Sequence, residues 1–471
     1  MPNELLRRIR AMGKALLGLI LILPAFGGAR ASVPLLPLEM FKPSLVVNTA
    51  GVPYVASWDG STSPFPVSKS EGGAWIHLGS PGFSWRETFF SSLALDATGT
   101  PHVALEGRDG WGGATTSSVM KYEGGAWVSI GELDNLSPPS EELMLIPHSL
   151  AFNAAGGLFV AGIKYDKGIV TISVMKFEGG TWVSEKPLEY PMKDQRLLFW
   201  LPSVAFSADG VPYVAYLEAI NEKSHILSVK KYEKGTWLPV GTLELQDVLH
   251  IAMVLDTTGV PYVAYTDATH GNRVSVVKFA GGSMVYVGSP GISPEQAWLP
   301  SLALDKDGAL YVAYAGFSHT RLSVMKFEGG TWVPVGQPGF TEVMGLSTLA
   351  LDSAGMLYVA YMKPEKDSIR LFSLSVMKFE GGAWVSTGSF EAADRAAGYD
   401  TVKHMANQGN KNAQYLLGMM YAKGQGVAKD DAEAEKWFRK AAIGGNEDAR
   451  KRLEEMGIKV ETQPDGKANK Q

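Results

Sequence analysis

Short apolar runs recur along residues 44–390 in units of about 50 residues, and turn-forming residues separate the runs. One unit has its runs at 301–305, 310–314, 322–327 and 331–335. Each unit also carries a Val-Ala pair after an aromatic residue or histidine. A second motif, typified by Ser-Val-Met-Lys-Phe-Glu-Gly-Gly-Thr-Trp-Val (323–333), follows in each unit. The pattern predicts four short β-strands in every unit.

Four strands in a repeat of 40–50 residues are typical of a β-propeller blade. The Val-Ala pair occurs seven times, so we predict a mainly β fold, a seven-bladed propeller of four-stranded blades, over residues 44–390. Residues 33–38 are a candidate for an additional strand, although nothing in the sequence requires it. We expect the motif tryptophans to pack between blades, because a residue that recurs in every blade serves every blade. They are Trp75, Trp127, Trp182, Trp237, Trp332 and Trp384, with Met284 in the fifth unit.

The spacing within a unit divides the connections into two kinds. Seven positions always separate the polar residue that ends strand one from the Val-Ala valine, and six always separate the motif lysine from the tryptophan position. By contrast, the distance from the alanine to the motif lysine ranges from 13 to 18. In an up-and-down blade, the fixed turns lie on one face of the ring and the variable loops on the other. Variable loops on a rigid scaffold usually carry function, so we predict binding on the variable-loop face.

The fixed turns have their own chemistry. Asp-x-x-Gly, as in Asp305–Gly308, suits a type I turn with glycine in a left-handed conformation. Asp305-Lys306-Asp307-Gly308 also resembles the start of a calcium loop, but the further ligands of such a loop are missing. We therefore interpret these segments as turns.

The unit Ser-Leu-Ala-Leu-Asp-x-x-Gly-x-x-Tyr-Val-Ala-Tyr resembles the first two strands of NHL-type propeller repeats, and more loosely those of kelch and WD-repeat propellers. The kelch double glycine stands elsewhere in the unit and the WD dipeptide is missing. The resemblance therefore implies the architecture and no particular ligand.

The apolar period becomes helical after residue 390. Residues 412–423 and 430–443 predict two helices, the second capped by Asp430 or Asp431. Residues 413–442 are similar to the Sel1-like repeat, a relative of the tetratricopeptide repeat, which implies an αα-hairpin for protein–protein contact. Partial copies flank it, so the predicted helical module covers residues 391–458, followed by a polar, disordered tail at 459–471.

The first 31 residues resemble a secretory signal peptide. Four basic residues precede a run of 12 apolar residues (15–26), and Ala29-Arg30-Ala31 provides a small-x-small cleavage site. The apolar run is too short for a membrane anchor, the alternative interpretation. We therefore predict a secreted or periplasmic protein with no integral membrane segment after cleavage.

Composition excludes several classes of site. The sequence has no cysteine, hence no disulfide, thiolate metal site or cysteine nucleophile. Its net charge of −5 shows no basic excess, so we predict no nucleic-acid partner. Metal-ligand spacings, a Gly-x-Ser-x-Gly elbow and a phosphate-binding loop are all absent, and we predict no cofactor, no metal and no enzyme.

Two groups of side chains on the variable-loop face are candidates for binding. Histidines there either converge as acid–base or metal groups or are ordinary exposed loop residues. Tryptophans outside the repeat register either form platforms for sugars and protein partners or cap the ends of blade cores. The predicted binding residues are Trp58, Trp85, Trp111, Trp200, Trp298, His225, His270 and His319.

Two hypotheses for function follow. The first is a protein-interaction scaffold that binds a protein partner through the variable-loop face and the helical repeats. The alternative is a carbohydrate-binding propeller with a polysaccharide as its ligand, including a polysaccharide lyase or glycoside hydrolase. Propellers host many functions, so the architecture does not choose between the two.

Overall fold

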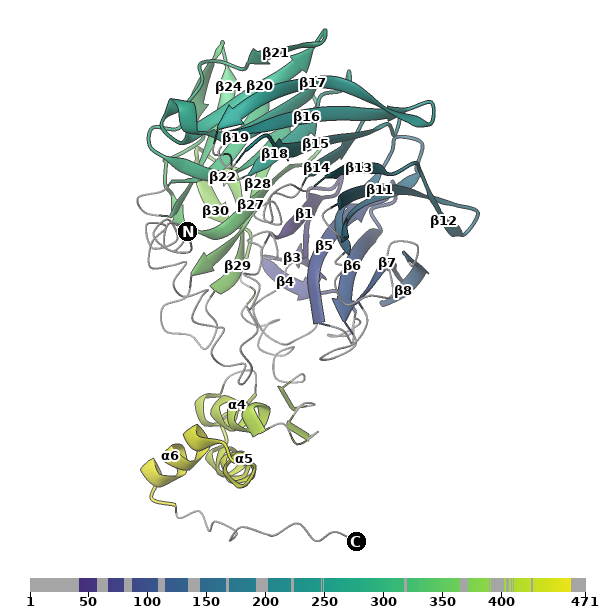
Figure 1. Ribbon diagram of the computed structural model, residues 1–471. Coiled ribbons are helices and arrows are strands. Elements are labelled where there is room, and N and C mark those ends of the chain that lie inside the picture. The colour runs from purple at the N-terminus through teal and green to yellow at the C-terminus, as the bar shows by residue number, and fades with distance from the viewer. Residues whose placement is uncertain are drawn as a thin grey trace.

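The strands of this chain form seven antiparallel sheets, each built from consecutive segments (Figure 1). The computed structural model describes residues 42–56, 67–79, 87–108, 115–133, 145–166, 169–191, 202–221, 224–246, 248, 250–316, 320–364, 372–388, 390, 402–403, 406–407, 409, 411–424 and 427–458. Within these residues, each sheet has four strands that pair with one another in chain order, and two sheets have one additional strand. The prediction of a mainly β, seven-bladed propeller is confirmed.

The first four blades have the following strands. Blade one has β1 (Ser44–Val47), β2 (Pro53–Ala56), β3 (Val67–Glu71) and β4 (Ala74–His77). Blade two has β5 (Glu87–Leu95), β6 (Pro101–Arg108), β7 (Thr115–Glu123) and β8 (Ala126–Glu132). Blade three has β9 (Leu145–Phe152), β10 (Leu158–Asp166), β11 (Ile169–Glu178), β12 (Thr181–Ser184) and the additional β13 (Leu188–Pro191). Blade four has β14 (Ser203–Phe206), β15 (Pro212–Ala219), β16 (Ser224–Glu233) and β17 (Thr236–Gln246).

The last three blades follow the same plan. Blade five has β18 (Ile251–Leu255), β19 (Pro261–Asp267), β20 (Arg273–Ala280) and β21 (Ser283–Tyr286), with the short helix η5 (Ala268–His270). Blade six has β22 (Ala297–Leu304), β23 (Leu310–Gly316), β24 (Arg321–Glu328), β25 (Thr331–Pro334) and the additional β26 (Thr341–Glu342). Blade seven has β27 (Met344–Leu351), β28 (Leu357–Pro364), β29 (Phe372–Glu380) and β30 (Ala383–Ser386).

The ring closes by packing of blade seven on blade one. The first strands of successive blades contact one another around the ring, and β27 contacts β1. At this joint the Thr348 hydroxyl donates to the Pro43 carbonyl at 2.5 Å, and the Tyr358 hydroxyl donates to the Gly51 carbonyl at 3.1 Å. Trp75 also stacks on Phe390, with ring centroids 4.5 Å apart. Among the described residues, blade one and blade seven are each built from their own consecutive strands, with no strand exchanged between them. Residues 33–38, the candidate for an additional strand, lie outside the described residues.

The Val-Ala pair explains how neighbouring blades fit. Both residues are buried in every blade because strand two is covered on both faces. The alanine of one blade and the valine of the next lie in one buried cluster, so a small side chain accommodates a larger one and the sheets approach closely. The clustered pairs are Ala56 with Val103, Ala104 with Val160, Ala215 with Val263, Ala264 with Val312, Ala313 with Val359, and Ala360 with Val55.

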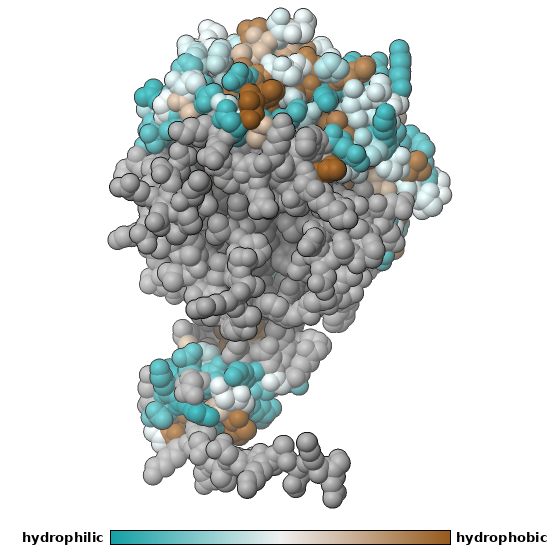
Figure 2. All heavy atoms as spheres, in the orientation of Figure 1, coloured by the Kyte–Doolittle hydropathy of each residue, from teal (hydrophilic) through white to brown (hydrophobic). Residues whose placement is uncertain are grey.

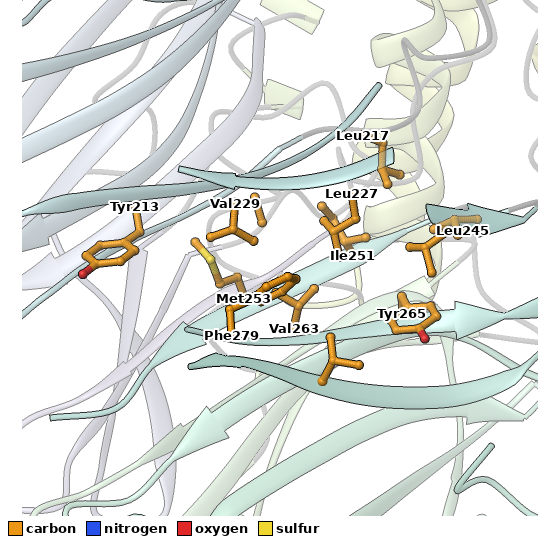
Figure 3. Close-up of a cluster of buried hydrophobic side chains, with 13 residues drawn as sticks. Tyr213, Leu217, Leu227, Val229, Leu245, Ile251, Met253, Val263, Tyr265 and Phe279 are labelled. Carbon is orange, nitrogen blue, oxygen red and sulfur yellow. The ribbon is translucent and has the colours of Figure 1, made fainter. Parts of the chain in front are cut away.

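The cluster between blades four and five shows this packing in detail. In Figure 3, Val229 of β16 lies across from Met253 of β18 and Val263 of β19. Phe279 belongs to the same cluster, and a Cβ atom added to Gly241 would come within 2.4 Å of its ring. Phe279 thus occupies a joint where blade five has Met284 in place of the repeated tryptophan.

The repeated tryptophans also lie at the joints, as predicted. The Trp127 indole donates to the Leu78 carbonyl of the preceding blade at 2.8 Å, and Trp332 donates to the Val287 carbonyl at 2.7 Å. Trp237 and Trp384 make the corresponding bonds. The indole nitrogen of Trp182 has no hydrogen-bond partner in the described part of the chain, although that side chain is buried to the same extent as Trp332.

The fixed turns are built as predicted. The Asp305 carboxylate accepts hydrogen bonds from the backbone N–H groups of Asp307 at 3.0 Å and Ala309 at 2.7 Å, and Gly308 has a φ of +83°. The same carboxylate bonds recur at Asp96, Asp256 and Asp352. The carboxylates are therefore used to hold the turns, which confirms the turn interpretation of these segments.

Three helices follow the ring, and Figure 1 shows them grouped beyond the strands. They are α4 (Lys411–Lys423), α5 (Asp431–Ile443) and α6 (Glu447–Glu455). Asp430 caps α5 by accepting from the backbone N–H groups of Ala432 and Glu433, as predicted. Phe438 packs so closely on Gly418 that a Cβ atom there would be 2.6 Å from its ring. No helix in the described ranges is long and apolar enough to cross a membrane.

Trp182 and Trp332 allow the inter-blade hydrogen bond to be measured. Both side chains are 9% exposed and tilt against a phenylalanine, but only Trp332 bonds to the preceding blade. We predict that Trp332→Phe lowers the free energy of unfolding by about 1–3 kcal/mol more than Trp182→Phe, because the Val287 carbonyl loses its donor. Urea denaturation of the two variants measures the difference, and equal losses would contradict the prediction.

Candidate functional site

The connection between β19 and β20 in blade five carries a hydrogen-bonded group of polar side chains on the variable-loop face. Asp267 ends β19, and its carboxylate caps η5 by accepting from the Thr269 backbone N–H at 3.1 Å. His270 is the last residue of η5, and Gly271 turns the chain with a φ of +76°. Because the helix occupies the loop, His270 does lie in a variable-face connection, as predicted.

The Asp267 side chain is only 3% exposed and is surrounded by donors. One of its oxygens accepts from the Thr269 hydroxyl at 2.6 Å. The other lies 2.8 Å from Nδ1 of His270, 2.8 Å from the Ser275 hydroxyl and 3.3 Å from the Tyr265 hydroxyl. A buried carboxylate requires such compensation, and here both oxygens have it.

The electrostatics of the group follow from this arrangement. Burial raises the pKa of Asp267, but the hydrogen bonds from Thr269, Ser275 and His270 lower it by more than burial raises it. The pKa of Asp267 therefore lies below its usual range. Burial, the bond to Tyr286 and the Asp267 charge together raise the pKa of Tyr265. Tyr265 therefore keeps its proton and acts as a donor, whereas Asp267 is an anion that holds the imidazole by its Nδ1 side.

The site presents an oriented imidazole at the surface. The His270 side chain is 39% exposed, and its ring meets the Tyr286 ring edge-on at 6.3 Å. With Nδ1 at Asp267, Nε2 is the nitrogen left for a ligand. Ser275 is fully buried and bonds to Asp267 rather than to the imidazole, so these residues do not form a nucleophile–base–acid triad.

Blade four repeats part of this network. Tyr216 and Ser228 are paired across β15 and β16, just as Tyr265 and Ser275 are paired across β19 and β20. Glu218 takes the position of Asp267 and accepts from the Ser228 hydroxyl at 2.9 Å. The carboxylates at these two positions were not among the residues predicted from the sequence. Their signal is an acid two residues after Val-Ala-Tyr, present in units four and five.

His225 is not where the sequence placed it. We predicted a loop residue, but it lies in β16 opposite Ala219 and Leu245 and is 1% exposed. The reason is that β15, β16 and β17 pair well beyond the repeated motifs, so the expected loop is strand. His225 therefore offers no surface to a ligand.

Trp298 also differs from its predicted place in a loop. It lies in β22, is 9% exposed and packs in a cluster with Leu322 and Val343. A register shift follows it, with Leu299 at a φ of +53°, and this irregularity lets β22 begin earlier than its repeat motif. Trp298 thus caps a blade core, the alternative that the sequence left open, and presents no platform.

The remaining predicted binding residues lie outside the described residues. They are Trp58, Trp85, Trp111, Trp200 and His319. Their role in binding stays a prediction. Within the described residues, no group of three or more His, Cys, Asp or Glu side chains is arranged to hold a metal ion.

Comparison with known proteins assigns a family to part of the chain. Residues 411–446 match the family model of the Sel1 repeat, which confirms the resemblance of the helical region. No curated protein matches the chain. The NHL-type or kelch-type character of the blades stays a prediction, because the family match covers the helices and none of the blades.

Solved structures with a similar fold have diverse descriptions. The β-propeller domain of the Trilobed protease from Pyrococcus furiosus, described as having an open velcro topology, is 12% identical with a TM-score of 0.46, over 74% of this chain and 96% of that chain. A puromycin-hydrolyzing peptidase from Mycobacterium tuberculosis is 12% identical with a TM-score of 0.48, over 77% and 55%. SapL1 lectin, in complex with alpha methyl fucoside, is 13% identical with a TM-score of 0.41, over 64% and 95%.

The prediction that the chain is not an enzyme is wrong. It rested on missing motifs, but the similar structures include puromycin hydrolases and a domain of a protease. The absence of a recognised catalytic motif is not a sufficient ground for excluding an enzyme. At 12–13% identity these similarities concern the fold and assign no activity to this chain.

Asp267 should make stability depend on pH in the acid range. Its pKa is lowered in the folded protein, so its contribution is present above the unfolded pKa of about 4 and is lost as pH falls through the folded pKa. We predict that Asp267→Asn costs about 1–3 kcal/mol at pH 7 and that the gap from wild type narrows below about pH 4. Urea denaturation at several pH values measures this.

Asp307→Asn is the matched control for that series. Asp307 is 75% exposed and pairs only with Lys306 among the described residues. Its replacement should leave stability nearly unchanged at every pH. A gap for Asp267→Asn that stays constant from pH 7 to pH 3 would contradict the assigned role of the Asp267 charge.

Proposed function

We propose that this protein is an interaction scaffold that binds a protein partner through the variable-loop face of its propeller and through its Sel1 repeat. The observation that carries the proposal is the match of the helical residues 411–446 to the Sel1 repeat, in a chain whose described strands form a ring of blades. Helical repeats of this kind stack into surfaces for protein contact. The ring adds a rigid support for loops.

The helices support this proposal by their own packing. Phe438, Ala434 and Leu453 form one buried core with their neighbours on α5 and α6, and Leu417 joins Trp437 in a second. On α6, Asp448, Lys451 and Glu454 are exposed and charged, as in a helix that caps a repeat array. Ile443 differs from these, because it is a large apolar residue with 72% exposure at the end of α5.

Hydrophobic surface elsewhere is dispersed. Figure 2 shows hydrophobic residues in separate small groups over the described part of the face it views. Several exposed apolar residues, such as Val128 at 46% and Val183 at 47%, follow the repeated tryptophans on the outermost strands. Each stands opposite a motif lysine, Lys121 and Lys176. These positions are therefore shared by the blades and do not mark one binding patch.

Capture by the full-length chain tests the scaffold proposal. Wild-type protein on a support should retain a specific partner from envelope extract, and Ile443→Ser should lower recovery about fivefold, as loss of an exposed apolar contact does at an interface. Val128→Thr is the control, since Val128 is exposed to a lesser degree on an outer strand. Retention by wild type no greater than by the support alone would refute the proposal.

We also propose that the protein is exported to the periplasm or secreted. Support comes from the basic leader, the 12-residue apolar run and the Ala29-Arg30-Ala31 site. Cleavage after Ala31 would leave Ser32 as the first residue. Mass spectrometry of protein recovered from an expressing bacterium should therefore find a chain that starts at Ser32 outside the cytoplasm, whereas an intact chain that remains in the cytoplasm would contradict export.

A further inference from the structure

We propose that Arg273 and His270 of blade five form a carboxylate-recognition site, and that its ligand is an acidic segment of a protein partner. The inference rests on the proposed interaction function and names the chemistry of one contact on the variable-loop face.

Gly291 brings the two side chains together. A Cβ atom on this glycine would be 3.1 Å from Cβ of His270 and 3.6 Å from Cδ of Arg273. Both side chains therefore lie against the same bare stretch of backbone, where φ is +66°. Any larger residue would push them apart, so glycine at this position permits the juxtaposition.

The surrounding backbone is held in place. The Gly291 N–H donates to the Ser275 hydroxyl at 2.9 Å, and the Ile292 N–H donates to the Val274 carbonyl at 2.7 Å. Asn272, immediately before Arg273, has a φ of +57°, and its carbonyl accepts from the Ala297 N–H at 2.9 Å. A non-glycine residue in this conformation indicates a loop determined by its surroundings, and a pre-ordered site loses less entropy on binding.

Among the described residues, the guanidinium group of Arg273 has no internal partner. The side chain is exposed, and it makes no hydrogen bond or ion pair with any residue in the described ranges. Asp267 stands directly opposite in the strand register, yet its two oxygens are already taken by Thr269, Ser275, Tyr265 and His270. The neighbouring carboxylate is thus committed to orienting His270, and within the described ranges no other carboxylate pairs with the guanidinium, which is available to an external anion.

A carboxylate is the anion that fits this pair. A guanidinium offers two parallel N–H donors to its two oxygens. The His270 imidazole, with Nδ1 held at Asp267, adds an Nε2–H donor when the ring is protonated. An acidic protein segment is favoured over an acidic polysaccharide because Trp298, the predicted sugar platform that falls among the described residues, is buried in the core.

Blade six supplies an internal control. Arg321 opens β24 as Arg273 opens β20, and it lies against Gly339 in the same way. However, its Nε donates to the Gly339 carbonyl at 2.5 Å, and Glu342 stands opposite it in the β24–β26 register. Arg321 therefore serves the fold of its own blade, whereas Arg273 does not.

Titration of the full-length protein with a fluorescein-labelled peptide of alternating glutamate and glycine tests the proposal. We expect binding by wild type, a loss of about tenfold in affinity for Arg273→Ala and a smaller loss for Arg273→Lys, which keeps the charge without the planar fork. Arg321→Ala should bind within about twofold of wild type. The same peptide with glutamine in place of glutamate should not bind.

Several results would overturn the inference. One is the absence of binding of the glutamate peptide by wild type. Another is an equal loss of affinity in Arg273→Ala and Arg321→Ala. A third is tighter binding of a galacturonate oligomer than of the peptide. Circular dichroism of each variant verifies the fold, which Arg273 should not affect because it is exposed. If wild type and Arg273→Ala retain the partner from extract equally, this inference fails and the scaffold proposal stands; if wild type retains none, the scaffold proposal fails.

Discussion

Close packing of small against larger side chains between neighbouring blades is the interaction on which the rest of the structure depends. The alanine of one strand two faces the valine of the next, and both are removed from water. Each blade is a thin sheet with two apolar faces, so it has no core until its neighbours cover it. The repeat therefore encodes an interface as well as a blade, and stability accumulates around the ring.

Closure of the ring uses the same interface. Ala360 of blade seven meets Val55 of blade one, and Phe390 stacks on Trp75 at the rim of that joint. Hydrogen bonds to the carbonyls of Pro43 and Gly51 add direction to this packing. Because Phe390 directly precedes the segment that leads to the helices, the end of the propeller and the start of the connection share one joint.

Polar chemistry concentrates where this packing ends. On the fixed-turn face, carboxylates such as Asp305 are consumed by backbone N–H groups. At the opposite end of blade five, Asp267 is buried among hydroxyl groups and an imidazole, and its charge orients His270 toward the surface. The same residue type thus has a structural role on one face and a positioning role on the other, and the difference lies in the donors around it.

The sequence by itself determined the repeat, the number of blades, the two kinds of connection and the Sel1 hairpin, because these follow from local spacing and turn chemistry. It did not place His225 or Trp298, since both depend on how far strands pair beyond their motifs and on the irregularity at Leu299. Nor did it reveal Asp267 or Arg273, whose roles arise from contacts with Ser275 across the β19–β20 pair and with Gly291 in the connection after β21. Only the tertiary structure decided which variable-face residues are buried, which carboxylate is already satisfied and which cation remains exposed.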